Sequence, residues 1–406
     1  MLICVSSKIL GTKKHLVYHD SEYSWSNILP ADAWVYGIPG SLKSLDVLLE
    51  FFNLEKPTLK SSPHVRSFYS LMQSGITEIP WHAVLPPLEF RRLLEGLISS
   101  LEGVLRCFFD SKYNGVFIDE RAFLLSLSRA YINVPLLTSY MATEKNQTVR
   151  STLSSFKPAA ELQTRRVMYN QAATLTGRLT IKKGPQVLTL PKKYRDIITS
   201  RYSSGKIMQV DFVSLEPRIA RLTAGFESGP DVYLQLSDEL FNSELTREQA
   251  KIAVLCALYG VSQRKLSKML GPKFNAVMVI DKIKKFFGVP ERLRLVREEL
   301  AIDAKFQNYF GRHIEPDRTD AGALVNYYVQ SSAADAALLG FIILKKKIDE
   351  LQLRCTPIFV IHDAMVLDIH IDDIASLENL VDPGIDVSSL GNFPVTLSVI
   401  TDSPNS

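Results

Sequence analysis

The sequence predicts an α+β protein, because strand-like runs lie on both sides of a long helical stretch. The run KIMQVDF at 206–212 is short and strand-like. Two more such runs follow late in the chain, PIFVIHDAMVLDIHI at 357–371 and NFPVTLSVI at 392–400. The helical patterns between them lie at 214–225, 246–260 and 262–305. Strands grouped on either side of helices favour α+β over regularly alternating βαβ units.

The part of the chain before this stretch also predicts both strands and helices. Residues 15–19 (HLVYH) are strand-like, whereas residues 42–52 and 87–109 have the apolar spacing of helices. Residues 115–165 are predicted to be mainly helical. With 406 residues and 46% hydrophobic content, the chain is long enough to fold into two or three globular domains.

Cysteine usage and hydropathy bear on the compartment. The four cysteines lie far apart and form no CxxC pair, so neither a zinc site nor a disulfide framework is predicted. This favours a cytoplasmic or other reducing intracellular compartment. The first ten residues lack a basic leader, so we expect no signal peptide. We also expect no apolar run as long as a membrane span, and hence no membrane partner.

Charge is distributed unevenly, although the net charge is only +4. Residues 145–201 hold twelve basic and two acidic side chains, and residues 246–300 hold twelve and five. Residues 350–406 hold one basic and nine acidic side chains. Such a chain could bind a polyanion on one surface and metal ions on another. Solvated helix faces would explain the same charges equally well.

Two aspartates stand out because each lies in an apolar, strand-like run. Asp211 is near the end of KIMQVDF, and Asp363 lies at the polar break within 357–371. A buried carboxylate is costly unless it is paired or binds a metal. If neighbouring strands bring them together, the two could hold two Mg²⁺ ions for phosphoryl transfer. The alternative is that Asp363 belongs to a hairpin turn and Asp211 caps a helix.

One predicted helix has a face suited to a nucleotide. TREQ at 246–249 is a capping-box pattern, and Gly260 is a predicted stop. Steps of four along this helix carry two cations, then an apolar and an aromatic residue: Arg247, Lys251, Leu255 and Tyr259. The triphosphate of a nucleotide could lie on Arg247 and Lys251, and its base against Leu255 and Tyr259. An amphipathic helix with two solvated charges is the alternative.

Six motifs in order resemble those of family A DNA polymerases, over about residues 165–406. Asp211 to Arg218 (DFVSLEPR) is similar to DYSQIELR, and Ile361 to Ala364 (IHDA) to VHDE. In this chain, the segment Arg247-x3-Lys251-x7-Tyr259-Gly260 is similar to the motif on the family's fingers helix. The remaining three matches are Thr176-Gly177-Arg178-Leu179 to TGRLS, Gly311-Arg312 to GR, and Asn326-x3-Gln330-x2-Ala333-Ala334-Asp335 to NAPMQGTAAD.

The resemblance implies a right-hand polymerase fold with an antiparallel-sheet palm, helical fingers and a shortened thumb. It also implies roles for eleven residues. Catalysis would depend on Asp211, Asp363 and Lys251, with the two aspartates as ligands of two Mg²⁺ ions. The dNTP would contact Arg247, Lys251, Leu255, Tyr259 and Glu216, with Glu216 blocking a ribose 2′-hydroxyl. The primer–template DNA would contact Arg178, Asn326, Gln330 and His362.

The chain departs from the family pattern at several of these places. Ala364 stands where the family usually has Glu, so one carboxylate beside the metal site is absent. Tyr233 stands where His is common, and Leu255 where Phe or Tyr is usual. Leu188 and Thr189 replace the usual Gln-Asn. We expect activity to survive these changes because both aspartates remain.

The resemblance also divides the chain. A degenerate exonuclease-like or replaced domain is expected at 1–110, where Asp20-Ser21-Glu22 resembles a DxE motif but no later carboxylate motif follows. The other expected parts are a reduced thumb at 111–168, opened by Asn114-Gly115-Val116-Phe117-Ile118-Asp119, the palm at 169–228 and 306–406, and fingers at 229–305. We therefore predict a DNA polymerase without proofreading.

Two other functions stay open at this point. A single-subunit RNA polymerase shares the palm and a Lys/Tyr-Gly helix, although Glu216 and the TGRL segment argue against it. A non-catalytic DNA-binding or assembly subunit that keeps the fold would explain Ala364. The short stretch from Asn114 to Thr176 further suggests a protein partner that supplies processivity.

Overall fold

The computed structural model describes residues 1–57, 85–159, 161–259, 263–271, 274–387 and 390–402, together with 63, 67 and 70. Gly260, the predicted helix stop, lies outside the described residues. The chain forms two units, Met1–Leu125 and Ser126–Ser406, and each is described by itself. The domain limits expected from the sequence remain predictions.

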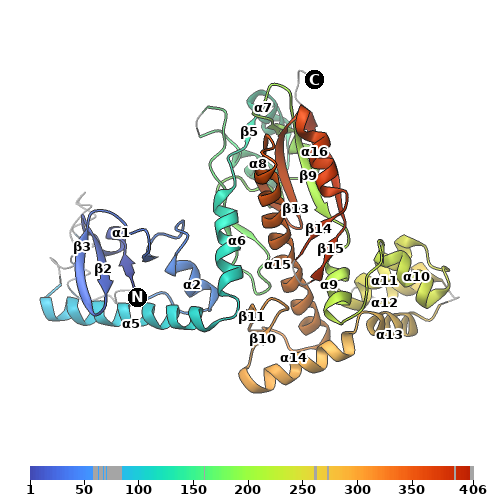
Figure 1. The fold of residues 1–406 in the computed structure, drawn as a ribbon, viewed down its shortest axis with the longest axis horizontal. Helices are drawn as coiled ribbons and strands as arrows, with labels where there is room; N and C mark the ends of the chain where they lie inside the picture. Colours follow the sequence, from blue (N-terminus) through green and yellow to red (C-terminus); the bar gives the residue numbers. More distant parts are fainter. Residues whose placement is uncertain are drawn as a thin grey trace. The chain divides into compact units, whose positions relative to one another are not determined.

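The first unit is a small sheet with helices (Figure 1). The strand order is β3-β2-β1-β4, with β1 and β4 parallel and the other pairs antiparallel. Its strands are β1 (Ile3–Val5), β2 (His15–His19), β3 (Glu22–Ser26) and β4 (Trp34–Tyr36). Its helices are α1 (Ser7–Leu10), α2 (Leu45–Phe51), α5 (Pro87–Asp110) and α6 (Asn114–Ser126), the last ending one residue beyond the unit. The predicted strand at 15–19 and helix at 87–109 are confirmed.

The Asp20-Ser21-Glu22 triplet lies in the hairpin between β2 and β3. His19 pairs with Glu22, so Asp20 and Ser21 form a two-residue turn, with φ values of 47° and 69°. Short polar residues tolerate this left-handed backbone. The turn therefore accounts for Asp20 and Ser21 at these positions without a role in metal binding. The Asp20 side chain is 74% exposed. The absence of proofreading stays a prediction.

The second unit contains a four-stranded antiparallel sheet in the order β12-β13-β9-β16. Its strands are β9 (Gly205–Phe212), β12 (Cys355–Ile361), β13 (Ala364–His370) and β16 (Val395–Asp402). The predicted strand at 206–212 and the two strands broken at His362-Asp363 are confirmed. The final strand predicted at 392–400 is confirmed from Val395 onward as β16, but its start is wrong, because Pro394, which lacks an N–H, separates β15 (Asn392–Phe393) from β16.

Helix α15 (Ala321–Glu350) packs against this sheet. A Cβ on Gly340 would come within 2.7 Å of Phe212 Cζ, and the rings of Phe212 and Phe341 are 5.3 Å apart. By length and composition α15 could cross a membrane, so the expectation of no apolar run of that length is wrong. Because 67% of its most apolar window is buried inside the protein, the helix is explained as the core of this unit.

Helices between β9 and α15 form a second core. Thr246 Oγ1 accepts from Gln249 N at 3.2 Å, and Gln249 Oε1 accepts from Thr246 N at 2.9 Å, so the predicted capping box is confirmed. These helices are α9 (Leu215–Thr223), α10 (Val232–Phe241), α11 (Arg247–Tyr259), α12 (Gln263–Leu270), α13 (Ala276–Phe286) and α14 (Val289–Asp303). In Figure 1, α10 to α13 gather to one side of the sheet, beyond α9.

Short elements complete the second unit. Its described residues also form four two-stranded ribbons. The paired strands are β5 (Tyr131–Ile132) with β8 (Ile198–Thr199), β6 (Met168–Asn170) with β7 (Thr180–Lys183), β10 (Phe306–Gln307) with β11 (His313–Ile314), and β14 (Ile385–Asp386) with β15. The remaining helices are α7 (Val134–Thr143), α8 (Gln147–Ser154), α16 (Ile374–Val381), and the 3₁₀ turns η1 (Val187–Thr189), η2 (Lys192–Ile197) and η3 (Ile371–Asp373).

Candidate active site

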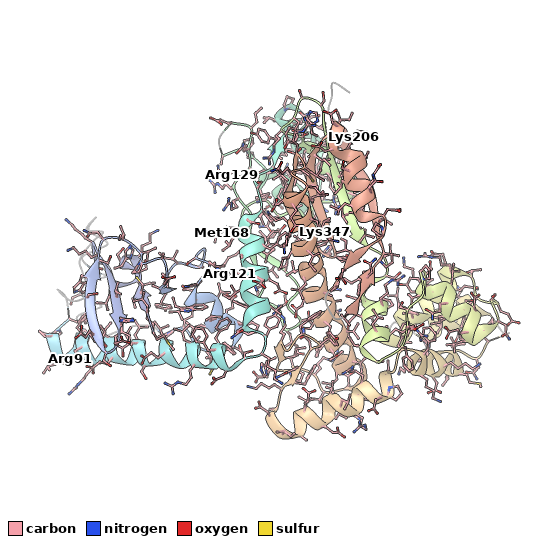
Figure 2. The ribbon with its side chains drawn as sticks, viewed as in Figure 1. Arg91, Arg121, Arg129, Met168, Lys206 and Lys347 are labelled. Carbon is pink, nitrogen blue, oxygen red and sulfur yellow. The ribbon has the colours of Figure 1, made fainter. Side chains whose placement is uncertain are left out.

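Antiparallel pairing of β9 and β13 brings the two predicted aspartates together. Asp211 lies directly opposite Ala364, and Asp363 immediately precedes Ala364 in the turn between β12 and β13. Phe212 N donates to the Asp363 main-chain oxygen at 3.2 Å, which extends the pairing into the turn. Lys206, labelled in Figure 2, marks the opposite end of β9. The site therefore lies at one end of the sheet.

The electrostatics of this pair suit a divalent cation. Burial and the neighbouring charge of Asp363 raise the pKa of Asp211 to about 6. Burial also raises the pKa of Asp363, and the Glu216 charge acts in the same direction. A cation between the carboxylates would offset both effects. Among the described residues, no group of three or more His, Cys, Asp and Glu side chains is arranged to hold a metal ion, so other oxygen atoms would have to complete the coordination.

A pocket of about 90 Å³ opens beside Asp363. Five residues predicted for the site line it: Arg178, Glu216, Gln330, His362 and Asp363. Its other lining residues are small or apolar, from the TGRL segment, the start of α9 and the middle of α15. This mixture of a few polar groups with apolar ones is typical of small-molecule sites.

Glu216 is the centre of a hydrogen-bond network at this pocket. Its two carboxylate oxygens accept from Arg178 Nη2 and from the hydroxyl of Tyr259. Burial, followed by the Glu216 charge, raises the pKa of Tyr259 well above its usual value, so this hydroxyl remains a donor. The network connects α9, α11 and the segment before β7. It fixes Glu216 at the pocket wall, where it was expected to face a sugar.

The cationic end of α11 differs from the expectation in one respect. Arg247 Nε donates to Asp231 Oδ2 at 2.6 Å, and its guanidinium lies 5.4 Å from the centre of the Tyr233 ring. Lys251, one turn along, is exposed, and Leu255 is partly buried. The structure thus brings Tyr259 to the pocket, while Arg247 is paired with an aspartate that sequence analysis did not single out.

Helix α15 presents the other predicted DNA contacts. Asn326 and Gln330 are four residues apart, on one face. Gln330 lines the pocket, whereas Asn326 does not, and the buried Asn326 Oδ1 has no hydrogen-bond partner among the described residues. Deeper in, the Arg312–Asp335 ion pair of 2.7 Å lies against Gly177, whose Cβ would come within 2.5 Å of Arg312 Cζ. This buried pair supports the loop that carries Arg178.

Three polar side chains near the site were missed by sequence analysis. They are Arg195, Gln209 and Asp231. Gln209 could have been found, because it lies two residues before Asp211 and the side chains of a strand alternate with a period of two. Asp231 and Arg195 carry no such signal, since their contacts depend on tertiary packing.

Comparison with known proteins agrees with this geometry. The profile described as DNA polymerase family A matches residues 110–404. The chain belongs to DNA polymerase family A. The matched region includes both aspartates, Glu216 and the whole of α11. The family suggested by the sequence motifs is therefore confirmed.

Bacterial relatives in family A are distant in sequence. DNA polymerase I of Bacillus subtilis (strain 168) is 26% identical over 248 residues, which are 52% of this chain and 28% of that protein. DNA polymerase I of Helicobacter pylori (strain J99) is 25% identical over 281 residues, 61% of this chain and 30% of that protein. The chain thus spans less than a third of the length of these relatives.

A solved family A structure shares the fold. The POL domain of Pol1 from M. smegmatis, in complex with DNA primer-template and dNTP, has a TM-score of 0.65 and 14% identity. The similarity covers 97% of this chain and 93% of that one. At this identity the similarity shows the fold alone, and it confirms the α+β polymerase fold predicted from the sequence.

Proposed function

We propose that this chain is a template-directed DNA polymerase that extends a primer 3′-hydroxyl with dNTPs and lacks proofreading. The observation that carries the proposal is the placement of Asp211 and Asp363 side by side next to a pocket walled by Glu216. Two adjacent carboxylates next to a pocket with polar walls suit phosphoryl transfer. Four widely separated cysteines further support a reducing intracellular location.

In the proposed reaction, the primer 3′-oxygen attacks the α-phosphorus of the dNTP, and the bond to pyrophosphate breaks. Members of family A use divalent metal ions. We propose that Asp211 and Asp363 would hold two Mg²⁺ ions, which when bound would supply positive charge for phosphoryl transfer. Lys251 and Arg247 bind the triphosphate, and Arg247 exchanges Asp231 for a phosphate. Catalysis then depends mainly on positioning and charge.

The remaining predicted residues position the other substrates. Leu255 and Tyr259 face the base and sugar of the dNTP. Arg178, Gln330 and His362 converge on the pocket from three elements and contact the primer–template. Among the described residues, the buried Asn326 Oδ1 has no hydrogen-bond partner. It could therefore accept a hydrogen bond from a nucleic acid.

Primer extension tests the proposal directly. The chain should add dNTPs to a primed DNA template in the presence of Mg²⁺, and should use rNTPs poorly. Efficient rNTP use without a primer would instead identify a single-subunit RNA polymerase. DNA binding without any incorporation, with Mg²⁺ or Mn²⁺, would identify a non-catalytic DNA-binding or assembly subunit.

Glu216→Ala should raise rNTP use relative to dNTP use by roughly tenfold or more, on the scale of other steric discriminations. The carboxylate is fixed at the pocket wall by Tyr259 and Arg178, so its stem excludes a 2′-hydroxyl. Single-nucleotide incorporation kinetics with matched dNTP and rNTP measure the ratio. Glu378→Ala on the exposed part of α16 is the control. An unchanged ratio in Glu216→Ala would place the sugar discrimination elsewhere.

We also propose that a protein partner supplies processivity, because few helices separate Asn114 from the palm. With a DNA trap present, the isolated chain should add few nucleotides per binding event, and fewer as salt rises. Each contact to a DNA phosphate adds to the affinity by releasing counterions, and this contribution weakens as salt rises. A chain that makes few such contacts therefore dissociates from DNA sooner. Long products at moderate salt from the chain alone would contradict this prediction.

A further inference from the structure

Gln209 connects the metal-binding end of the sheet to a cation on η2. It lies two residues before Asp211 on β9, so the two side chains share one face of the sheet. Gln209 Nε2 donates to Asp211 Oδ2 at 3.2 Å, and Arg195 Nη1 donates to Gln209 Oε1 at 3.1 Å. Arg195, Gln209 and Asp211 thus form a continuous chain of hydrogen bonds.

The orientation of the Gln209 amide follows from the chemistry of its two neighbours. A guanidinium can only donate hydrogen bonds, so Arg195 requires the amide oxygen. An ionised carboxylate can only accept them, so Asp211 requires the amide nitrogen. With Arg195 in place, the amide cannot turn round without losing both bonds. Arg195 therefore holds Gln209 as a donor to Asp211.

The other strands beside Asp211 give its carboxylate no such support. On β13, the residue opposite is Ala364, which offers only a methyl group. On β16, Thr396 Oγ1 donates to the main-chain oxygen of Asp211, at 3.4 Å, and not to its carboxylate. Within the described part of the chain, Gln209 makes the side-chain hydrogen bond that fixes this carboxylate.

We infer that Gln209, held by Arg195, is a positioning residue that orients Asp211 toward a bound divalent cation at a site where Ala364 contributes no carboxylate. The inference rests on the proposed function. One oxygen of Asp211 is engaged by Gln209, which sets the rotation of the carboxylate and leaves the other oxygen for a cation. Hydrogen bonds to ligating carboxylates commonly tune metal sites in this way.

Binding of Mn²⁺ alone to the full chain, measured by calorimetry and electron paramagnetic resonance, tests the inference without DNA or dNTP. Gln209→Met keeps the size of the side chain but removes the donor, and should weaken Mn²⁺ binding about tenfold. The control is Gln147→Met, an exposed glutamine at the start of α8. A Kd for Gln209→Met within twofold of that of the unchanged chain would overturn the inference.

Asp211→Asn distinguishes this failure from failure of the proposed function. It should abolish tight Mn²⁺ binding. If it leaves binding unchanged, the metal site itself is misplaced, and the inference about Gln209 is overturned together with it. If Asp211→Asn abolishes binding but Gln209→Met does not weaken it, the metal site stands and the positioning role is overturned.

Steady-state kinetics separate positioning from a general structural role. In Gln209→Met, the metal concentration for half-maximal activity should rise, with the KM for dNTP and the melting temperature unchanged. Equal changes in all three would overturn the inference. Arg195→Lys keeps the positive charge but shortens the reach to the amide. Arg195→Lys should weaken Mn²⁺ binding in the otherwise unchanged chain and have no further effect in a chain that already carries Gln209→Met. Equal effects in both chains would overturn the inference that Arg195 acts on Asp211 through Gln209.

Discussion

Asp363→Asn should reduce Mg²⁺-dependent primer extension on the order of 10³-fold or more. The exchange keeps the size and shape of the side chain but removes one of the two adjacent charges proposed to hold the metal ions. Charge stabilisation by bound metal contributes several kcal/mol to such reactions, and each 1.36 kcal/mol corresponds to a factor of ten in rate. Single-turnover incorporation on a primed template measures the loss.

Stability distinguishes this loss from misfolding. Burial, followed by the charge of Asp363, raises the pKa of Asp211 to about 6, so the folded chain binds this proton more tightly than the unfolded chain does. That difference makes stability fall as pH rises through the interval up to about 6. Removing the Asp363 charge relieves the repulsion, so the melting temperature of Asp363→Asn at pH 7 should be equal or higher.

Asp382→Asn provides the matched control, because Asp382 is exposed at the end of α16. It should leave both activity and stability unchanged. Full activity of Asp363→Asn would rule out the assignment of this aspartate as a metal ligand. A lowered melting temperature would attribute the loss of activity to folding instead.

The elements of the sheet were predictable because their patterns are local. A polar His362-Asp363 step between two apolar runs predicts a tight turn, and the structure has two strands meeting there. The split at Pro394 was missed because an apolar run was read through a residue that cannot pair. The burial of α15 could not be predicted, since an apolar thirty-residue helix is equally compatible with a protein core or a membrane.

The site was partly predictable for a similar reason. Glu216, Arg178 and Tyr259 were named from motifs, and the structure brings these three together in one network. Their contact could not be derived from periodicity, because it joins segments more than thirty residues apart. The pairing of Arg247 with Asp231 was likewise hidden, since a surface-facing cation on a helix does not reveal its partner on another element.

Asp335→Ala should destabilise the second unit by about 3–5 kcal/mol, the usual cost of leaving one buried charge without its counterion. The side chains of Asp335 and Arg312 are 0% and 2% exposed, and Arg312 Nη2 donates to Asp335 Oδ1 at 2.7 Å. Asn308 Nδ2 also donates to Asp335, at 2.6 Å, so a second buried donor keeps only its bond to Ser331 Oγ, at 2.9 Å. Urea unfolding followed by circular dichroism measures the change in free energy of unfolding.

Two comparisons make this expectation specific to burial. Glu291→Ala removes a surface partner of Arg294, where both side chains are more than half exposed, and should cost much less than Asp335→Ala. The double exchange Arg312→Met with Asp335→Leu replaces the pair by apolar groups and should recover part of the loss. Recovery should be incomplete, because Arg312 Nη1 also donates to the Gln171 main-chain oxygen at 3.1 Å. If Asp335→Ala costs no more than Glu291→Ala, water must reach Arg312, and the pair does not support the Arg178 loop as a rigid, buried unit.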